Sequence, residues 1–287
     1  MSKMTSASTR HYGRVFDEIA TDYNRHRPGY PVELVDYACK IAGLKSGDNV
    51  LELGCGSGQL TRDLVDRGFN VTALEPGMQL IALAEQNVKE LGAAEFVNEK
   101  FEDAKLPKTY YKAVFSASAF HWIDPDISWQ KVAKLLIPGG VLALISYFGL
   151  SEQRTSGDLE LLLAALKKVS PEIAASWPHY HKLDEIIDGV KTRQENISDA
   201  WAWLGDYDLG RKYVSNLFSD TEVAVVPHLV EQTADELIAL FRTISSYSRL
   251  STQQQNDIEY EYREIYKNIG RPIRSSSAAV LVTARLS

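Results

Sequence analysis

The strongest local signal of the fold is the stretch Asn49-Val-Leu-Glu-Leu-Gly-Cys-Gly-Ser-Gly-Gln59. Its first five residues are an apolar run typical of a buried strand, and residues 59–67 carry apolar side chains at helical spacing. The three alternate glycines between these segments let the chain turn sharply and bring its backbone close to a ligand, which any Cβ would prevent. The stretch therefore predicts a strand, a ligand-binding turn and a helix.

The spacing of these glycines distinguishes two classes of nucleotide-binding turn. A dinucleotide-binding turn has the pattern G-x-G-x-x-G, whereas Gly54, Gly56 and Gly58 form G-x-G-x-G. A nicotinamide-dependent dehydrogenase is therefore disfavoured. Glu75 ends the next predicted strand, 21 residues beyond Gly54, where a carboxylate can accept hydrogen bonds from both hydroxyls of a ribose.

Short apolar runs alternate with amphipathic segments along most of the chain, which is typical of a parallel sheet with helices on both faces. The predicted strands are residues 49–53, 71–75, 95–98, 112–117, 141–148, 222–226 and 278–284. The predicted helices of this body are residues 31–42, 59–67, 78–91, 129–136, 235–247 and 252–268. Accordingly, residues 1–150 are predicted to form a cofactor-binding core, 151–218 an aromatic-rich helical cap, and 219–287 the remainder of the core.

Composition narrows the classes of function. The 287 residues carry a formal net charge of −7, which disfavours nucleic acid as a substrate because phosphate binding needs a basic surface. No apolar run approaches the length of a membrane-spanning helix, and the first residues lack the apolar region of a secretory signal. The two cysteines, Cys39 and Cys55, are too few for a disulfide framework. We therefore expect a cytoplasmic protein that acts on a small molecule, as a monomer or homodimer.

Taken together, these elements resemble the class I S-adenosylmethionine-dependent methyltransferases. Three further stretches resemble the type-11 group of this family, which includes trans-aconitate methyltransferases: residues 16–31, 116–124 and 240–247. The resemblance implies a Rossmann-like α/β fold with strand order 3-2-1-4-5-7-6, in which residues 278–284 form the antiparallel seventh strand. It also implies S-adenosylmethionine as the cofactor and methyl transfer by in-line displacement to a carboxylate, hydroxyl or amine.

The resemblance also assigns site residues. Glu52 to Gly58 would line the methionine end of the cofactor, Glu75 would hold the ribose, and Met78 would pack on the adenine. The implied cofactor-binding residues are Tyr23, Arg27, Glu52, Gly54, Cys55, Gly56, Gly58, Glu75, Pro76, Met78, Phe101, Glu102, Ser116 and Ala117. The implied substrate-binding residues are Arg27, His121, Trp122 and Tyr147. Many relatives have an aspartate before Phe101-Glu102, where this chain has Lys100.

Two candidate residues leave alternatives open. His121 follows the fourth predicted strand, where ligands of such sheets bind, and is the candidate general base; binding the substrate or packing the pocket wall is favoured over base catalysis. Arg27 belongs to a cationic group that either holds an anionic substrate or serves a solvated helix end. His179 and His181 lack a cysteine or acidic residue at metal-site spacing, so no metal site is predicted.

Other functions remain open at this point. A protein that binds S-adenosylmethionine without transferring its methyl group, as a regulatory or scaffold partner, would keep the same glycine turn and Glu75. Nucleic-acid methylation would have to overcome the negative charge. The fold by itself does not select an acceptor, because it supports many chemistries.

Overall fold

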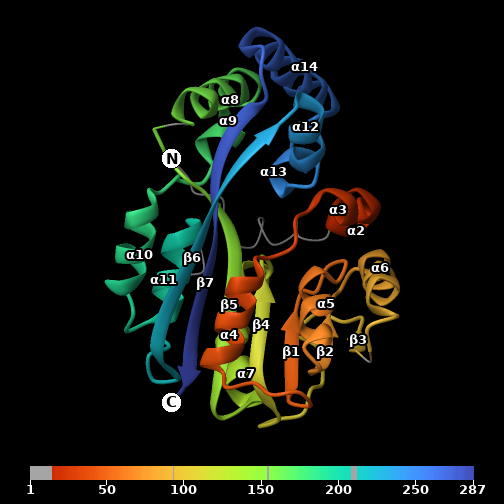
Figure 1. Cartoon of the computed structure of the whole chain (residues 1–287), viewed down its shortest axis with the longest axis vertical. Helices are drawn as coiled ribbons and strands as arrows, with labels where there is room; N and C mark the ends of the chain where they lie inside the picture. Colours follow the sequence, from red (N-terminus) through yellow and green to blue (C-terminus); the bar gives the residue numbers. More distant parts are fainter. Residues whose placement is uncertain (1–14, 93, 154, 208–211) are drawn as a thin grey trace.

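The computed structural model describes residues 15–92, 94–153, 155–207 and 212–287. Its centre is a seven-stranded sheet of order β3-β2-β1-β4-β5-β7-β6 (Figure 1). The strands are β1 (Asn49–Leu53), β2 (Asn70–Leu74), β3 (Ala94–Val97), β4 (Tyr111–Ala117), β5 (Leu136–Gly149), β6 (Phe218–Gln232) and β7 (Ile273–Leu286). Strands β1 to β5 pair in parallel, and β7 is antiparallel to both β5 and β6. The predicted strand order and the antiparallel seventh strand are confirmed.

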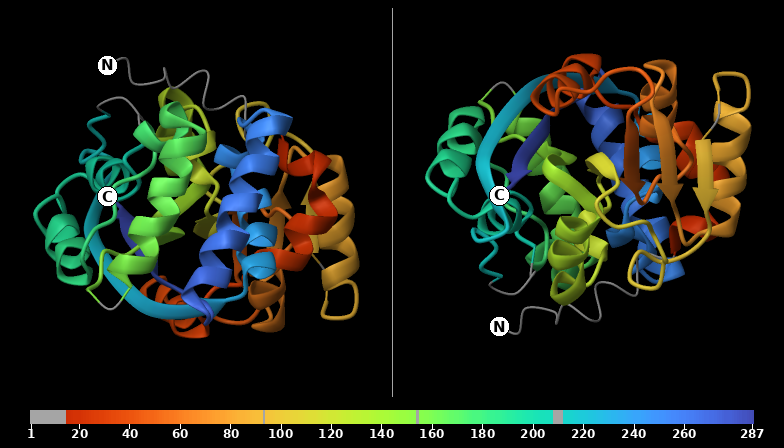
Figure 2. Two further views of the ribbon diagram at one scale, coloured as in Figure 1. Left: turned by 90° about the horizontal axis from the view of Figure 1, so that it is seen from above. Right: turned by 90° about the horizontal axis from the view of Figure 1, so that it is seen from below.

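Helices cover both faces of the sheet because successive strand residues point to opposite sides. On one face, Val50 and the other strand side chains that point to the same side pack against α4 (Val32–Ile41), α5 (Gln59–Asp66) and α6 (Met78–Val88). On the other face, Leu51 and the strand side chains that point to its side pack against α7 (Pro125–Leu135), α10 (Leu183–Lys191) and α11 (Ile197–Gly205). Trp129 of α7 and Trp201 of α11 are fully buried there. The views in Figure 2 show these layers from both ends.

A third apolar cluster lies beyond one end of the sheet, and we call its helices the upper layer. They are α8 (Ser156–Val169), α9 (Pro171–Ala175), α12 (Ala234–Arg242), α13 (Ser245–Ser248) and α14 (Thr252–Ile269) (Figure 1). Residues 151–218 thus supply α8 and α9 to the upper layer and α10 and α11 to the face of the sheet. The upper layer therefore combines helices from two distant parts of the chain.

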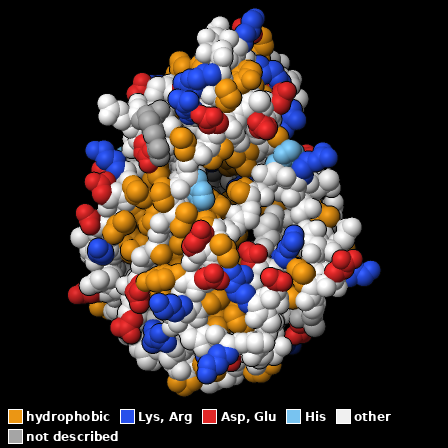
Figure 3. Space-filling view, in the orientation of Figure 1, with side chains coloured by type: hydrophobic (Ala, Val, Ile, Leu, Met, Phe, Trp, Pro, Cys, Tyr) orange, Lys and Arg blue, Asp and Glu red, His pale blue; other side chains and the backbone are white. Residues whose placement is uncertain are grey.

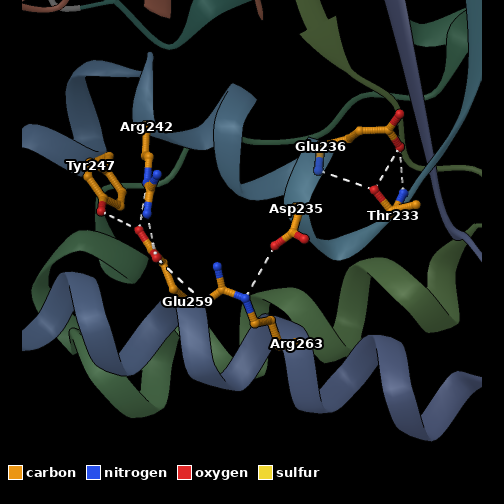
Figure 4. A network of polar contacts seen from close by, with 7 residues as sticks. All are labelled: Thr233, Asp235, Glu236, Arg242, Tyr247, Glu259 and Arg263. Carbon is orange, nitrogen blue, oxygen red and sulfur yellow. Dashed lines mark hydrogen bonds and ion pairs between the residues drawn. The ribbon is translucent and has the colours of Figure 1, made fainter.

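Polar contacts tie this upper layer together (Figure 4). Arg242 donates two hydrogen bonds to the buried carboxylate of Glu259, at 2.8 and 2.7 Å, and the Tyr247 hydroxyl donates a third at 2.6 Å. The Arg263 guanidinium reaches both Glu259 and Asp235. These contacts join α12 and α13 to α14, so the segment before α13 is held in place over the sheet end.

Some helices and strands begin or end at other residues than predicted, where polar or glycine-rich residues form part of the helix or strand. Helix α7 begins at Pro125 rather than at 129, because the Asp124 side chain caps it by accepting a hydrogen bond from the Asp126 N–H at 2.9 Å. Strand β5 begins at Leu136 rather than 141 and takes up the Pro-Gly-Gly residues, where its register against β4 shifts. The predicted helix 235–247 is divided into α12 and α13.

Strands β6 and β7 extend well beyond the predicted residues 222–226 and 278–284. They pair from Phe218–Leu286 to Gln232–Ile273 and reach the upper layer, where Ile273 is buried. β6 is the edge strand and alternates exposed polar with half-buried residues, so its ends lack an apolar run. Among the described residues no helix is long and apolar enough to cross a membrane. The predicted absence of a secretory signal concerns residues 1–14, which lie outside the described residues.

Candidate functional site

The turn after β1 has the conformation that its glycines predict. Gly54, Gly56 and Gly58 all have positive φ angles, of 72°, 56° and 88°. The Gly54 and Cys55 N–H groups donate to the Leu74 carbonyl at 2.8 and 2.9 Å, which ties the turn to the end of β2. A Cβ on Gly54 would lie 2.4 Å from the Ala119 Cβ. Glycine at 54 is therefore required by the close approach of the segment that follows β4.

Glu75 lies directly after β2 and faces this turn. Its side chain is buried, and its Oε2 accepts from the Gly56 N–H at 3.0 Å while Oε1 accepts from the Gly77 N–H at 2.9 Å. Burial raises the pKa of its carboxyl, and the two backbone N–H groups oppose that rise. A carboxylate oxygen has more than one lone pair, so each oxygen keeps capacity for a ligand hydroxyl. The residues present therefore fit a ribose.

Glu52, Cys55 and Gly58 lie behind the turn and do not line the cavity described below. Thr61 donates a 2.6 Å hydrogen bond to Glu52, and Gly58 packs against Ala84 of α6. Burial raises the pKa of the Glu52 carboxyl to about 8, which Thr61 partly opposes. In this structure Glu52 contacts α5, so its position supports the turn.

Stability should depend on pH through Glu52. Its carboxyl titrates near 4.5 when unfolded and near 8 when folded, so the folded chain binds more protons between these values and the free energy of unfolding falls as pH rises through them. At about 1.4 kcal/mol per pKa unit, the loss is a few kcal/mol. Glu52→Gln keeps an acceptor for Thr61 and removes the titration, so we expect a flatter profile in urea unfolding between about pH 5 and 8. The exposed Glu90→Gln is the control, and equal slopes for all three chains would refute the assignment.

Helices α2 (Val15–Glu18) and α3 (Ala20–His26) cover the turn. Asp17 accepts hydrogen bonds from the Gln79 and Leu80 N–H groups, at 2.7 and 3.0 Å, and so binds α2 to the start of α6. The ring of Phe16 makes edge contacts with those of Tyr23 and Trp122, at centroid distances of 5.5 and 5.9 Å. No sequence pattern indicates the anchoring role of Asp17, because this role depends on a contact between distant segments.

A cavity of about 710 Å³ opens between the carboxyl ends of the strands, α2–α3 and the upper layer. In Figure 3 the surface is hollowed below the upper helices, and hydrophobic side chains surround the hollow. The predicted site residues that line the cavity are Tyr23, Arg27, Gly54, Gly56, Glu75, Pro76, Phe101, Glu102, Ala117, His121, Trp122 and Tyr147. Those outside the lining are Glu52, Cys55, Gly58, Met78 and Ser116.

The part of the cavity beside Glu75 we call the donor end. Phe101 is buried there, and Glu102 accepts a hydrogen bond from the Asp124 N–H at 3.0 Å, which fixes it to the start of α7. Met78 is 70% exposed at the start of α6, so it does not contact this end in the structure. The Ser116 hydroxyl instead donates to the Leu53 carbonyl at 2.9 Å, between β4 and β1. Buried Leu80 lines the wall on the α6 side.

The opposite part of the cavity, the acceptor end, is built from aromatic rings and hydroxyls. His121 stacks on Tyr207 with ring centroids 4.3 Å apart and planes 7° apart. Ser118 accepts a 3.2 Å hydrogen bond from Tyr30 and lies 3.3 Å from the Ser146 hydroxyl. The wall at this end also includes Tyr147, Phe148, Trp177, Tyr180, Ile244 and Ser245. Tyr207 belongs to the aromatic-rich segment 151–218, but no sequence pattern indicates that it is a site residue, because its stacking partner is 86 residues away.

Arg27 lies between the two ends, just after α3. Its Nη2 donates to the Thr243 carbonyl at 2.7 Å, and its guanidinium lies 5.3 Å from the centre of the Tyr23 ring. Its Nε is buried and has no hydrogen-bond partner among the described residues. A buried N–H without a partner is costly, so this donor is expected to be satisfied by a ligand.

His121 is uncharged at neutral pH in this setting. Burial, with the nearby Arg27 cation, lowers the pKa of its imidazole to about 3. Its Nδ1 is buried and has no partner among the described residues. An imidazole of such low basicity is a weak proton acceptor, so the geometry favours hydrogen bonding to a ligand over base catalysis.

Comparisons with known proteins agree with this site. Residues 51–144, which include the glycine turn and Glu75, match the family model of the methyltransferase domain. An uncharacterized methyltransferase of Mycobacterium tuberculosis is 35% identical over 144 residues, which are 49% of this chain and 55% of that protein. The matched part thus spans about half the length of that relative.

Two further proteins are similar over shorter or more divergent stretches. The malonyl-[acyl-carrier protein] O-methyltransferase of Enterobacter lignolyticus is 35% identical over 95 residues, 33% of this chain and 37% of that one. A solved structure assigned as a type II methyltransferase, from Anaeromyxobacter dehalogenans, superposes with a TM-score of 0.57 at 21% identity and covers 90% of this chain and 97% of that one. The structural likeness shows the shared Rossmann-like fold.

Proposed function

We propose, from the premise that residues 51–144 form a class I S-adenosylmethionine-dependent methyltransferase domain, that the whole chain methylates a small carboxylic acid. The donor would occupy the end of the cavity at Gly54, Gly56 and Glu75, and the acceptor the aromatic end. The observation that carries the proposal is the buried Nε–H of Arg27 at the junction of the two ends, which has no hydrogen-bond partner in the part of the chain that the structure describes.

Charge at the two ends supports an acidic acceptor. The acidic side chains that line the cavity are Glu75, Glu99, Glu102 and Asp124, and they belong to segments at the donor end. The cationic side chains of the lining are Lys100, beside Phe101 at the donor end, and Arg27, and His121 at the aromatic end is neutral. A guanidinium forms strong charge-assisted hydrogen bonds with a carboxylate, whereas a protonated amine would meet Arg27 as a like charge. The malonyl substrate in the name of the Enterobacter relative also bears a carboxylate.

Methyl transfer to a carboxylate requires the protein mainly to align the acceptor with the methyl donor. S-adenosylmethionine supplies an electrophilic methyl group on a sulfonium. A carboxylate carries no proton at neutral pH, so its oxygen can form the new bond to carbon, as the carbon–sulfur bond breaks, without a general base. Arg27 would orient the acceptor, and His121 would hydrogen-bond to it through Nδ1, which has no partner among the described residues. Tyr23, Phe16 and Trp122 would exclude water from the reacting atoms.

Methyl transfer from labelled S-adenosylmethionine to a panel of small molecules tests the proposal. The panel contains small polycarboxylic acids, including trans-aconitate because of the type-11 resemblance, together with aromatic acids, phenols and amines of matched size. We expect label in base-labile methyl esters of one or more acids. Label in phenols or amines alone would contradict the carboxylate assignment. If the chain binds the donor but no acceptor is labelled, the non-catalytic binding function is favoured instead.

A further inference from the structure

A cluster of three metal-ligand side chains lies where the wall of the acceptor end meets α10. The ligand atoms of His179, His181 and Glu185 all lie within 4.8 Å of one another. The spacing within the sequence did not suggest this cluster. The segment before α10 places both imidazoles beside the first turn of the helix, which carries Glu185.

His181 is the most firmly held of the three. It is buried, its carbonyl accepts a 2.9 Å hydrogen bond from the Ser151 N–H, and its backbone pairs with Leu150 beyond the end of β5. Its ring packs on that of Trp203, with the ring centroids 4.3 Å apart. This contact and the backbone pairing hold the imidazole beside the first turn of α10.

Glu185 and His179 complete the cluster from two sides. The Lys182 N–H donates to one carboxylate oxygen of Glu185 at 2.9 Å, at the start of α10. Among the described residues no hydrogen bond is found to the other oxygen of this carboxylate. The exposed ring of His179 lies 4.9 Å from that of His181. His179 also lines the cavity, beside Trp177 and Tyr180. The three donors must come closer together to share an ion, and two of them, on His179 and Glu185, belong to exposed side chains.

We propose that His179, His181 and Glu185 bind one divalent transition-metal ion of the class that prefers imidazole, such as Zn²⁺ or Ni²⁺. Two imidazoles and one carboxylate are suited to these ions, whereas Ca²⁺ and Mg²⁺ require mainly oxygen ligands. The ion would join residues 179–181 to α10 and so fix the wall segment that carries Trp177 and Tyr180. This inference does not depend on the proposed methyl transfer, because its three ligands are different side chains from Gly54, Gly56 and Glu75 of the donor end.

Calorimetric titration of the untagged, chelator-treated full chain with zinc chloride and nickel chloride tests the site. We expect binding of one ion per chain at micromolar or lower concentration, and no comparable binding of magnesium chloride. Glu185→Gln and His179→Ala each remove one ligand from an exposed position and should weaken zinc binding at least about tenfold. Zinc should raise the melting temperature of the unaltered chain and raise it less in either variant.

Matched variants distinguish this site from adventitious binding. Asp184→Asn removes a carboxylate from the same helical turn, and His26→Ala removes an imidazole from α3. Both should bind zinc like the unaltered chain. The proposal is overturned if the folded chain binds neither zinc nor nickel. It is also overturned if Glu185→Gln and His179→Ala leave the affinity unchanged, in which case any bound ion lies elsewhere.

Discussion

Replacing Glu75 with alanine is expected to weaken binding of S-adenosylhomocysteine, the demethylated donor, by more than tenfold and up to several hundredfold. Each charge-assisted hydrogen bond to a ribose hydroxyl contributes about 1.5–3 kcal/mol, and 1.4 kcal/mol corresponds to a factor of ten. The change also leaves the Gly56 and Gly77 N–H groups without their acceptor, which loosens the turn itself. Calorimetric titration of the variant measures the loss.

Two controls separate a binding role of Glu75 from a folding role. Glu75→Gln keeps the side-chain shape and one carbonyl acceptor, so its affinity should lie between those of the alanine variant and the unaltered chain. The exposed Glu85→Ala on α6 should bind normally. Circular dichroism and the melting temperature establish that each variant is folded. A folded Glu75→Ala chain with unchanged affinity would refute the ribose assignment.

Replacing Arg27 with alanine is expected to raise the KM for a carboxylic acid acceptor by about ten- to a hundredfold. The basis is the loss of a charge-assisted hydrogen bond of about 1.5–3 kcal/mol from a partly buried guanidinium. Affinity for S-adenosylhomocysteine should change much less, because Glu75 and the glycine turn remain. Steady-state kinetics with the acid identified in the labelling experiment measure the effect.

Removal of Arg27 has a second, independent readout. Its cation lowers the pKa of His121, so the pKa of this imidazole should rise in Arg27→Ala, although burial still keeps it below the ordinary value. Histidine nuclear magnetic resonance titration detects the change. Arg25→Ala on the same helix, at an exposed position, should leave both the KM and this pKa unaltered. An unchanged KM in Arg27→Ala would exclude Arg27 from acceptor binding.

The sheet could be predicted because local sequence patterns indicate its strands and the resemblance to a known family implies their order. Residues 49–53 followed by the glycine turn indicate β1 and α5 by themselves, and the resemblance supplies the strand order around them. The ends of β6 and β7 were not predictable. Their outer residues mix polar with apolar side chains and form no apolar run, and they are strands because of pairing between segments more than forty residues apart. The split of residues 151–218 between two packing sites likewise depends on tertiary contacts with α14 and β6.

Those site residues that belong to short sequence motifs could be predicted from the sequence. Gly54, Gly56 and Glu75 meet at one edge of the sheet, as their positions after β1 and β2 require. Tyr207 on His121 and Asp17 on α6 join residues that no spacing rule connects. Glu185 lies four residues beyond His181, yet only the turn into α10 makes it a neighbour of His179 as well.

Calorimetric titration of the unaltered chain with S-adenosylmethionine and S-adenosylhomocysteine tests most directly whether the chain binds the methyl donor. NAD⁺ is the control. The cavity beside Glu75 predicts one binding site with micromolar affinity for the first two compounds and no measurable binding of NAD⁺. A folded chain that binds neither S-adenosyl compound, or that binds NAD⁺ instead, would contradict the claim.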